Sequence, residues 1–256
     1  MTAAELPSRF DIARVATRTF NIVSRNIVVF GALTVLLYVL PHIGGDIIDE
    51  TTDHLPGSFS RLLFSGSDAL YALAAAIGHV ALVGALIRGT VADLNGERAD
   101  IMACLKTGFR LFFPVLGVSL VVFLGVLLGL IALVIPGLML LTAWLVAVPA
   151  VAIEREGVRE GLARSTELTR GHRWPIFGLI AIFCIGAAIV GGAIRHAEDA
   201  AAHVIGFLPG MDVNPTSHLF GGLVALVATV GMVAIYYELR AIKEDAGPND
   251  LAAILD

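Results

Sequence analysis

The chain has 256 residues, of which 57% are hydrophobic and only 15% charged, with a formal net charge of −5. Ordinary soluble domains carry about 25% charged residues, and the mean hydropathy of this chain is +0.85. These values exclude an ordinary soluble protein, and the clustering of the charges between long uncharged runs predicts a membrane protein with several spanning helices.

The N-terminal segment carries four arginines before the first apolar run begins at Ile27. A secretory signal peptide needs its apolar run soon after a positive start, so this segment is not expected to be one. Four of its apolar side chains fall close to one helical face: Ile12, Val15, Phe20 and Val23. This spacing predicts an amphipathic helix at the cytoplasmic interface within residues 1–26.

Six apolar runs follow in chain order: residues 27–43, 69–87, 111–135, 137–153, 174–194 and 219–235. None of them contains Asp, Glu, Lys or Arg, each of which would cost at least ~2.5 kcal/mol at mid-bilayer. A spanning helix needs ~20 apolar residues, whereas the strands of a membrane barrel have ~10 residues of alternating polarity. The runs therefore predict an all-α integral membrane protein, with about six transmembrane helices in residues 27–240 and a cytoplasmic tail at 241–256.

Local signals predict where some of these helices begin, turn or bend. Ser67 is expected to cap the start of the second span, and Pro136-Gly137 to form a tight turn between the third and fourth spans. Pro149 is expected to kink the fourth span. Gly125 and Gly129 form a GxxxG pattern that lets helices approach closely. Packing within the chain is its favoured use, and a dimer seam is the alternative.

The basic residues lie almost entirely on one side of this topology. Of the 17 Lys and Arg residues, 15 fall in the N-terminal segment, the second-to-third and fourth-to-fifth connections, and the C-terminal tail. Only Arg61 and Arg195 remain for the other side. Because basic loops stay in the cytoplasm, both termini are expected to be cytoplasmic in a multi-pass protein of the bacterial inner membrane.

Two connections on the basic side also have helical spacing of apolar residues. Residues 99–109 place Met102, Leu105 and Phe109 at i, i+3 and i+7, and the fourth-to-fifth connection pairs Val158 with Leu162. Such helices are expected to bind anionic lipid headgroups on the cytoplasmic face through their arginines. The candidate residues are Arg14, Arg18, Arg25, Arg155 and Arg159. The alternative is that each segment only extends a neighbouring span.

Candidate chemistry is sparse. His79 is the one strongly polar side chain near the middle of a span, and it is either a proton or ligand site or a hydrogen-bonded structural histidine. His196, Asp199 and His203 share a helical face, but no metal site is expected because such spacing is common on solvated helices. Cys104 and Cys184 are expected as free, buried thiols. No catalytic or cofactor motif is present, and no nucleic-acid partner is expected because the basic segments lack aromatic stacking residues.

One stretch and the end of the last span carry a family resemblance. Residues 144–174 contain Pro149, Glu154, Gly157, Arg164-Ser165, Leu168-Thr169, Arg170-Gly171 and Trp174, and the last span closes with residues 236–240, YYELR. These motifs resemble the bacterial glycerophosphoryl diester phosphodiesterase membrane domain and related uncharacterised six-span families. The resemblance implies a membrane module without the catalytic barrel, since the chain after its last span leaves no room for a barrel of ~250 residues.

The sequence therefore predicts a non-enzymatic inner-membrane module that binds lipid or partner proteins in envelope maintenance or assembly. The alternative is a transporter or channel for a hydrophobic or zwitterionic solute, which a solvated cavity reaching His79 would favour. A membrane enzyme is the third hypothesis and would need several polar groups that converge. A homo-oligomer stays open under each of them.

Overall fold

The computed structural model describes residues 10–45, 59–205 and 215–244, and its regular elements there are all helical. They are α1 (Ile12–Arg25), α2 (Ile27–Thr34), the π-helical η1 (Val35–Val39), α4 (Phe59–Leu94), α5 (Ile101–Arg110), α6 (Phe112–Ala132), α7 (Val134–Ala143), α8 (Ala147–Glu154), α9 (Val158–Thr169), α10 (Arg173–Ile205) and α11 (Pro215–Glu244). Asp11 caps α1 and Asp100 caps α5, each by accepting a hydrogen bond from a backbone N–H of the first turn.

Six helical segments of the described chain are long and apolar enough to cross a bilayer. They are Ile27–Gly45, Leu70–Leu94, Phe112–Ala132, Val134–Glu154, Arg173–Glu198 and Pro215–Glu244. The prediction of an all-α membrane protein is thus confirmed. The first span continues through the π-helical turn η1, and the fourth is made of α7 and α8 with a break between them.

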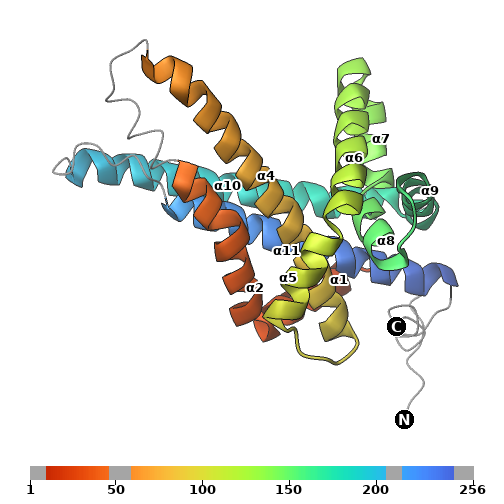
Figure 1. Cartoon of the computed structure of the whole chain (residues 1–256). Helices are drawn as coiled ribbons and strands as arrows, with labels where there is room; N and C mark the ends of the chain where they lie inside the picture. The colour runs from red at the N-terminus through yellow and green to blue at the C-terminus, as the bar shows by residue number, and fades with distance from the viewer. Residues whose placement is uncertain (1–9, 46–58, 206–214, 245–256) are drawn as a thin grey trace.

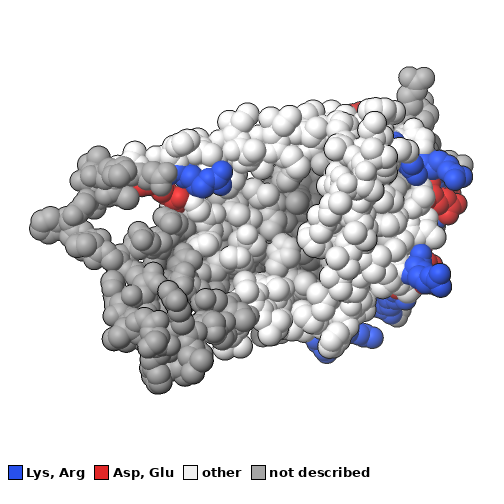
Figure 2. Space-filling model, turned by 90° about the horizontal axis from the view of Figure 1, so that it is seen from above, with Lys and Arg blue, Asp and Glu red and all other residues white. Residues whose placement is uncertain are grey.

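The spans diverge from one end of the molecule (Figure 1). The short helices α1, α5, α8 and α9 lie at that end, where α1 packs on α11 and α5 packs on α4. The α6–α7 hairpin rises on one side, while α10 and α11 run together on the other. We call the end that holds α1, α5, α9 and the adjoining ends of α4, α8 and α11 the charged end. Figure 2 shows most of the visible Lys and Arg at one end of the face in view, a smaller basic patch with acidic atoms beside it at the other end, and a wide uncharged zone between them.

The buried core lies close to the charged end. All seven residues of α8 from Ala147 to Ile153 are buried, against α6, α9 and α11. A second cluster joins Ile22, Phe30 and Leu33 to Leu82 and Leu86 of α4. The outer lengths of α6 and α10 are mostly exposed and apolar, as surfaces that face lipid must be.

Glycines set the closest helix crossings. A Cβ at Gly78 of α4 would overlap the carbonyl oxygen of Leu37 in η1, so the first span and α4 touch backbone to backbone there. A Cβ at Gly125 would overlap the indole of Trp144, and one at Gly129 would lie 2.9 Å from the Gly137 Cα. The expected use of Gly125 and Gly129 in packing within the chain is therefore confirmed.

Three local predictions differ from the structure. Ser67 does not cap a helix, because α4 already begins at Phe59. The turn between the third and fourth spans lies at Leu133, which has an extended backbone, and Pro136-Gly137 falls within α7. Proline is tolerated there because the first-turn N–H groups of a helix have no partner within the helix. Pro149 likewise lies in the first turn of α8, just after the break that replaces the expected kink.

The three predicted surface helices are present as α1, α5 and α9. The predicted pair Val158 and Leu162 of α9 packs against the core, whereas the predicted apolar faces of α1 and α5 include exposed side chains. Phe20 is 72% exposed, and Met102 and Phe109 are also exposed. In α1 the buried residues are Val15, Thr19 and Ile22. Helix α11 continues through Glu244, four residues beyond the expected end of the membrane domain, and the rest of the expected tail lies outside the described residues.

Candidate functional site

The break in the fourth span is stabilised by hydroxyl groups from α9. Helix α7 ends at Ala143, whose carbonyl oxygen has no helical donor because α8 begins only at Ala147. Ser165 Oγ donates to this oxygen at 2.8 Å. Thr169 Oγ1 lies 3.3 Å from the same oxygen and 2.9 Å from the Ser165 carbonyl oxygen, so its one hydrogen is shared between them. Non-helical backbone at membrane depth requires such partners. The Arg164-Ser165 and Leu168-Thr169 pairs noted in the sequence thus have a clear local role.

A polar network joins α8, α9 and α11 beside this break. The Tyr236 hydroxyl donates to Glu154 Oε1 at 2.5 Å, and Arg164 Nε donates to the same oxygen at 3.1 Å. Arg164 also pairs with Glu244, to which Arg240 Nε donates at 2.6 Å. Each acid therefore has an arginine partner, so the network is a bonded structural junction with no free base.

Glu238 ties α1 to α11 in the same region. Its side chain is only 1% exposed, and it accepts from Arg14 Nη1 at 2.6 Å, with Arg18 Nη1 at 3.5 Å from its other oxygen. Arg14 and Arg18 are 43% and 34% exposed. A buried carboxylate requires such partners, so the docking of α1 neutralises a charge that α11 would otherwise bury alone.

The remaining arginine candidates occupy two different settings. Arg25 Nη2 donates to Asp93 of α4 at 2.5 Å. Arg155, directly after α8, and Arg159, in the first turn of α9, are exposed, and neither forms an ion pair with another described residue. Arg155 takes the left-handed backbone conformation, with φ of 56°, where the chain leaves α8. A headgroup role for these five arginines stays a prediction.

An apolar groove of about 440 Å³ runs between α1, α10 and α11. Five of its lining residues come from α1, four from α10 and five from α11, with Leu145 closing one side. Thr19 is its one hydroxyl, and that hydroxyl donates to the Val15 carbonyl at 2.8 Å. The groove therefore offers an apolar surface with no charged group.

The intramembrane candidate His79 belongs to a cluster that the sequence did not bring together. The edge of its ring faces the ring of Tyr38, with centroids 5.8 Å apart. Tyr38 stacks on His42 at 4.3 Å, and the ring of His42 lies 5.4 Å from that of His218. The first, second and sixth spans thus meet through aromatic and histidine side chains.

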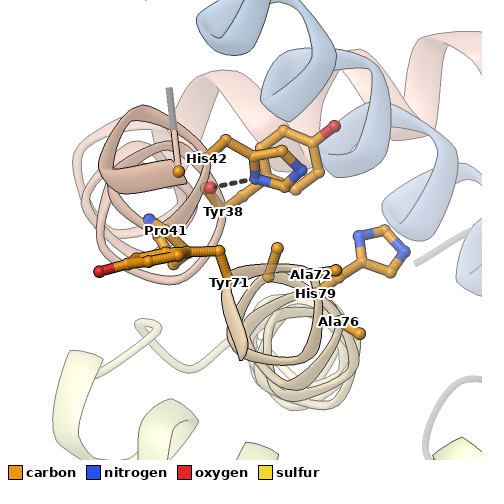
Figure 3. Close-up of a pocket in the computed structure, with 9 residues that line it drawn as sticks. Tyr38, Pro41, His42, Tyr71, Ala72, Ala76 and His79 are labelled. Carbon is orange, nitrogen blue, oxygen red and sulfur yellow. Dashed lines mark hydrogen bonds between the residues drawn. The ribbon is translucent and has the colours of Figure 1, made fainter. Parts of the chain in front are cut away.

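Three residues of this cluster, Tyr38, His42 and His79, border a cavity of about 530 Å³ between the first span and α4. His42 Nδ1 lies 2.7 Å from the Tyr38 carbonyl oxygen (Figure 3). A carbonyl oxygen accepts only, so Nδ1 carries the hydrogen of this bond. Figure 3 shows Tyr71 and His79 leaving α4 in different directions, so they do not converge on one point. No described acid lines this cavity.

The other candidate residues carry less chemistry. Cys104 and Cys184 are free, as predicted, but only Cys104 is buried. Burial raises the pKa of the Cys104 thiol to about 11. No group of three His, Cys, Asp or Glu in the described parts of the chain is arranged to hold a metal ion. The side chains of Asp199 and His203 lie outside those parts.

Sequence reasoning missed the acids that hold the arginines. Asp93 and Glu238 each lie near the end of a long apolar helix, and each is mostly buried next to a guanidinium of α1. One sequence signal could have identified these acids as arginine partners. Each lies close to the end of an apolar run, on the side of the membrane where the basic helix is expected. The apolar groove left no such signal, because its walls come from three segments far apart in the chain.

A model of one protein family, described as a domain of unknown function (DUF7847), matches residues 48–240, about three quarters of the chain. The match covers α4 to most of α11, including Glu154, Arg164, Tyr236 and Arg240 of the polar network but not Glu244, and leaves α1 and α2 outside. No curated protein and no solved structure matches the chain.

Proposed function

For this chain, which belongs to the family described as a domain of unknown function (DUF7847), we propose a non-enzymatic role as a membrane module that binds phospholipid. The single observation that carries the proposal is the apolar groove between α1, α10 and α11. The fatty acyl chain of a lipid from the surrounding bilayer is its natural occupant, because the groove opens among lipid-facing helices and lacks charge.

The depth of the groove suits one leaflet. Its α11 wall extends from Val227 to Ile235, which is ~12 Å along a helix axis at 1.5 Å per residue. Half of a hydrocarbon core ~30 Å thick is ~15 Å. Its α10 wall, Leu179 to Cys184, lies in the part of α10 nearest the charged end. An acyl chain from the leaflet at the charged end would therefore reach most of the groove.

The charges at that end suit the headgroup of the same lipid. Arg14 and Arg18 lie on α1, the helix that forms one wall of the groove, and both guanidiniums remain partly exposed beside Glu238. Each basic residue near an anionic leaflet contributes ~1 kcal/mol of attraction. The exposed Phe20 and Met102 would insert among the lipids next to these charges, as the apolar residues of interfacial helices do.

The same account assigns the charged end to the cytoplasm. Its basic helices favour that side by the positive-inside rule, and with the even number of candidate spans both termini would lie there. The proposed location is the bacterial inner membrane, and the proposed resemblance to the glycerophosphoryl diester phosphodiesterase membrane domain is consistent with it. A membrane-impermeant thiol reagent tests the orientation on a Glu156→Cys variant in which Cys104 and Cys184 are replaced. Labelling in inverted vesicles but not in intact cells is expected, and the reverse would contradict this orientation.

Native mass spectrometry of the protein released from lipid discs tests the binding. We expect phospholipid to stay bound at a fixed stoichiometry, and Gly231→Leu to remove the phospholipid held in the apolar groove. A Cβ at Gly231 would have only Thr19 Oγ1 nearby, at 3.9 Å, so the larger side chain projects into the groove without a backbone clash.

Gly186→Leu is the matched control, since Gly186 also lies in a spanning helix and its Cβ would meet no atom within 4 Å. This variant should keep the lipid. Lipid present only in bulk proportions, or equal loss in the two variants, would contradict the proposal. A dimer mass in place of bound lipid would instead assign the groove to a second copy of the chain.

Transport of a hydrophobic or zwitterionic solute is the second candidate. One observation favours it: the cavity of about 530 Å³ reaches His79 and lies next to the π-helical turn of the first span. A water-filled path would make a His79→Cys variant react with a membrane-impermeant thiol reagent. If that variant stays unlabelled, the cavity is closed to water and transport through it is excluded.

A further inference from the structure

A second cavity at the charged end has a different chemistry from the apolar groove. It measures about 510 Å³ and lies where α1 meets α2, opposite the connection from α4 to α5. Its charged lining residues are Arg25, Asp93, Glu97 and Arg98, so two positive and two negative groups surround one space. On the bilayer side it is bordered by Val28, which is 78% exposed at the start of the first span.

Asp93 fixes one wall of this cavity. Its carboxylate is 8% exposed and accepts from Arg25 Nη2 at 2.5 Å and from Asn26 Nδ2 at 2.8 Å. This pairing occupies one edge of the Arg25 guanidinium and holds its direction. Arg25 is itself 61% exposed. Its remaining N–H groups are therefore available to an anion.

The turn after α4 places the other two charges. Gly96 takes a φ of 80°, and the Glu97 N–H donates back to the Ala92 carbonyl at 2.9 Å. This left-handed helix stop reverses the chain and brings Glu97 and Arg98 to the cavity. Both side chains are exposed, and neither forms a hydrogen bond or ion pair with another described residue.

We propose that this cavity binds the headgroup of a phospholipid that carries both a phosphate and a primary ammonium group, as in a phosphoethanolamine lipid. Arg25 and Arg98 would hold the phosphate, since guanidinium groups donate paired hydrogen bonds to such oxygens. Glu97 would accept from the ammonium group, and the same carboxylate disfavours a headgroup that is only anionic.

The exposed valine at the cavity edge favours a lipid over a soluble zwitterion. Val28 faces outward in the first turn of α2, where the acyl chains of a lipid held by its headgroup would run along the span. This inference rests on the proposal that the protein binds phospholipid. It names the class of headgroup bound, at a cavity next to the end of α1 rather than in the groove along it. It does not require the apolar groove.

The test uses the full chain in discs made of equal parts of phosphatidylethanolamine, phosphatidylcholine and phosphatidylglycerol, followed by native mass spectrometry. The wild type should retain the ethanolamine lipid above its share. Glu97→Gln should lower the ratio of ethanolamine lipid to glycerol lipid roughly three- to fivefold, the factor carried by one exposed charge pair. Arg98→Gln should lower the retention of both lipids, since it removes a phosphate partner.

Glu156→Gln is the matched control, an exposed acid at the charged end but outside this cavity, and it should leave the ratio unchanged. An unchanged ratio in Glu97→Gln overturns the headgroup assignment while the proposed lipid binding stands. Retention of no lipid by the wild type overturns both. Displacement of the bound lipid by an excess of soluble phosphoethanolamine would show that the ligand is a free zwitterion, and would overturn the claim that it is a phospholipid headgroup.

Discussion

The docking of α1 on α11 depends on one buried acid, and its removal gives a sharp test of the charged end. Glu238→Gln keeps the shape of the side chain but removes the charge that Arg14 approaches at 2.6 Å. Arg18, at 3.5 Å, loses the same partner. Because Val15 and Ile22 still pack against their neighbours, the expected effect is more frequent opening of α1, with the spans intact.

The magnitude follows from the burial of the two sides of the pair. A hydrogen bond to a charged group contributes about 1.5–3 kcal/mol, and the removal of one partner of a fully buried ion pair costs about 3–5 kcal/mol. Here the acid is buried, but the arginines are 43% and 34% exposed and regain water when the acid is lost. We therefore expect α1 opening to become easier by about 2 kcal/mol, or about 30-fold in its equilibrium constant.

Hydrogen–deuterium exchange of the protein in lipid discs measures this directly. Amides of residues 12–25 should exchange about 30-fold faster in Glu238→Gln, while those of α6 should not change. The same change should be smaller in an Arg14→Gln background, because the pair is already broken. Unchanged protection of α1 in Glu238→Gln, or equal deprotection by the exposed-site variant Glu156→Gln, would refute the reasoning.

Three further predictions concern packing and burial at other positions. Because the pKa of Cys104 is raised to about 11, only roughly one Cys104 thiol in a thousand is ionised at pH 8. The rate at which Cys104 is alkylated should therefore rise about tenfold per pH unit up to pH 10. A rate that levels off by pH 9 would be inconsistent with its burial. Gly78→Leu should lower the thermal stability in lipid discs by driving η1 of the first span away from α4, whereas Gly186→Leu, in open space, should not; equal midpoints would contradict the crossing. Combined loss of the Ser165 and Thr169 hydroxyls should cost about 1–3 kcal/mol in detergent-titrated unfolding, and no change would show that another donor satisfies the broken span.

The spans and the surface helices could be predicted from sequence because each depends on local composition. An apolar run without charge has few stable forms other than a spanning helix in a bilayer, and the Asp11 and Asp100 caps reinforce the starts of α1 and α5. The turn at Leu133 could not be predicted from Pro136-Gly137. Both residues also fit the first turn of a helix. The close packing of α7 on α6 at Gly137 favours the helix over a turn at Pro136-Gly137.

The sites depend on contacts between distant segments, which periodicity does not encode. The apolar face predicted for α1 included Phe20, but Glu238 and the α11 surface turn the helix so that Thr19 and Ile22 are buried and Phe20 is exposed. His79 was identified as a single polar residue within a span. Its neighbours Tyr38 and His42 lie in the first span, and only the crossing at Gly78 brings them to it.

The most direct test of the proposed lipid binding is photocrosslinking with a phospholipid that carries a photoreactive group within its acyl chain. The account predicts crosslinks concentrated on the groove walls, residues 179–184 of α10 and 227–235 of α11, and their loss in Gly231→Leu. Crosslinks spread evenly over the lipid-facing surface of α6, with no excess in the groove and no effect of that substitution, would contradict it.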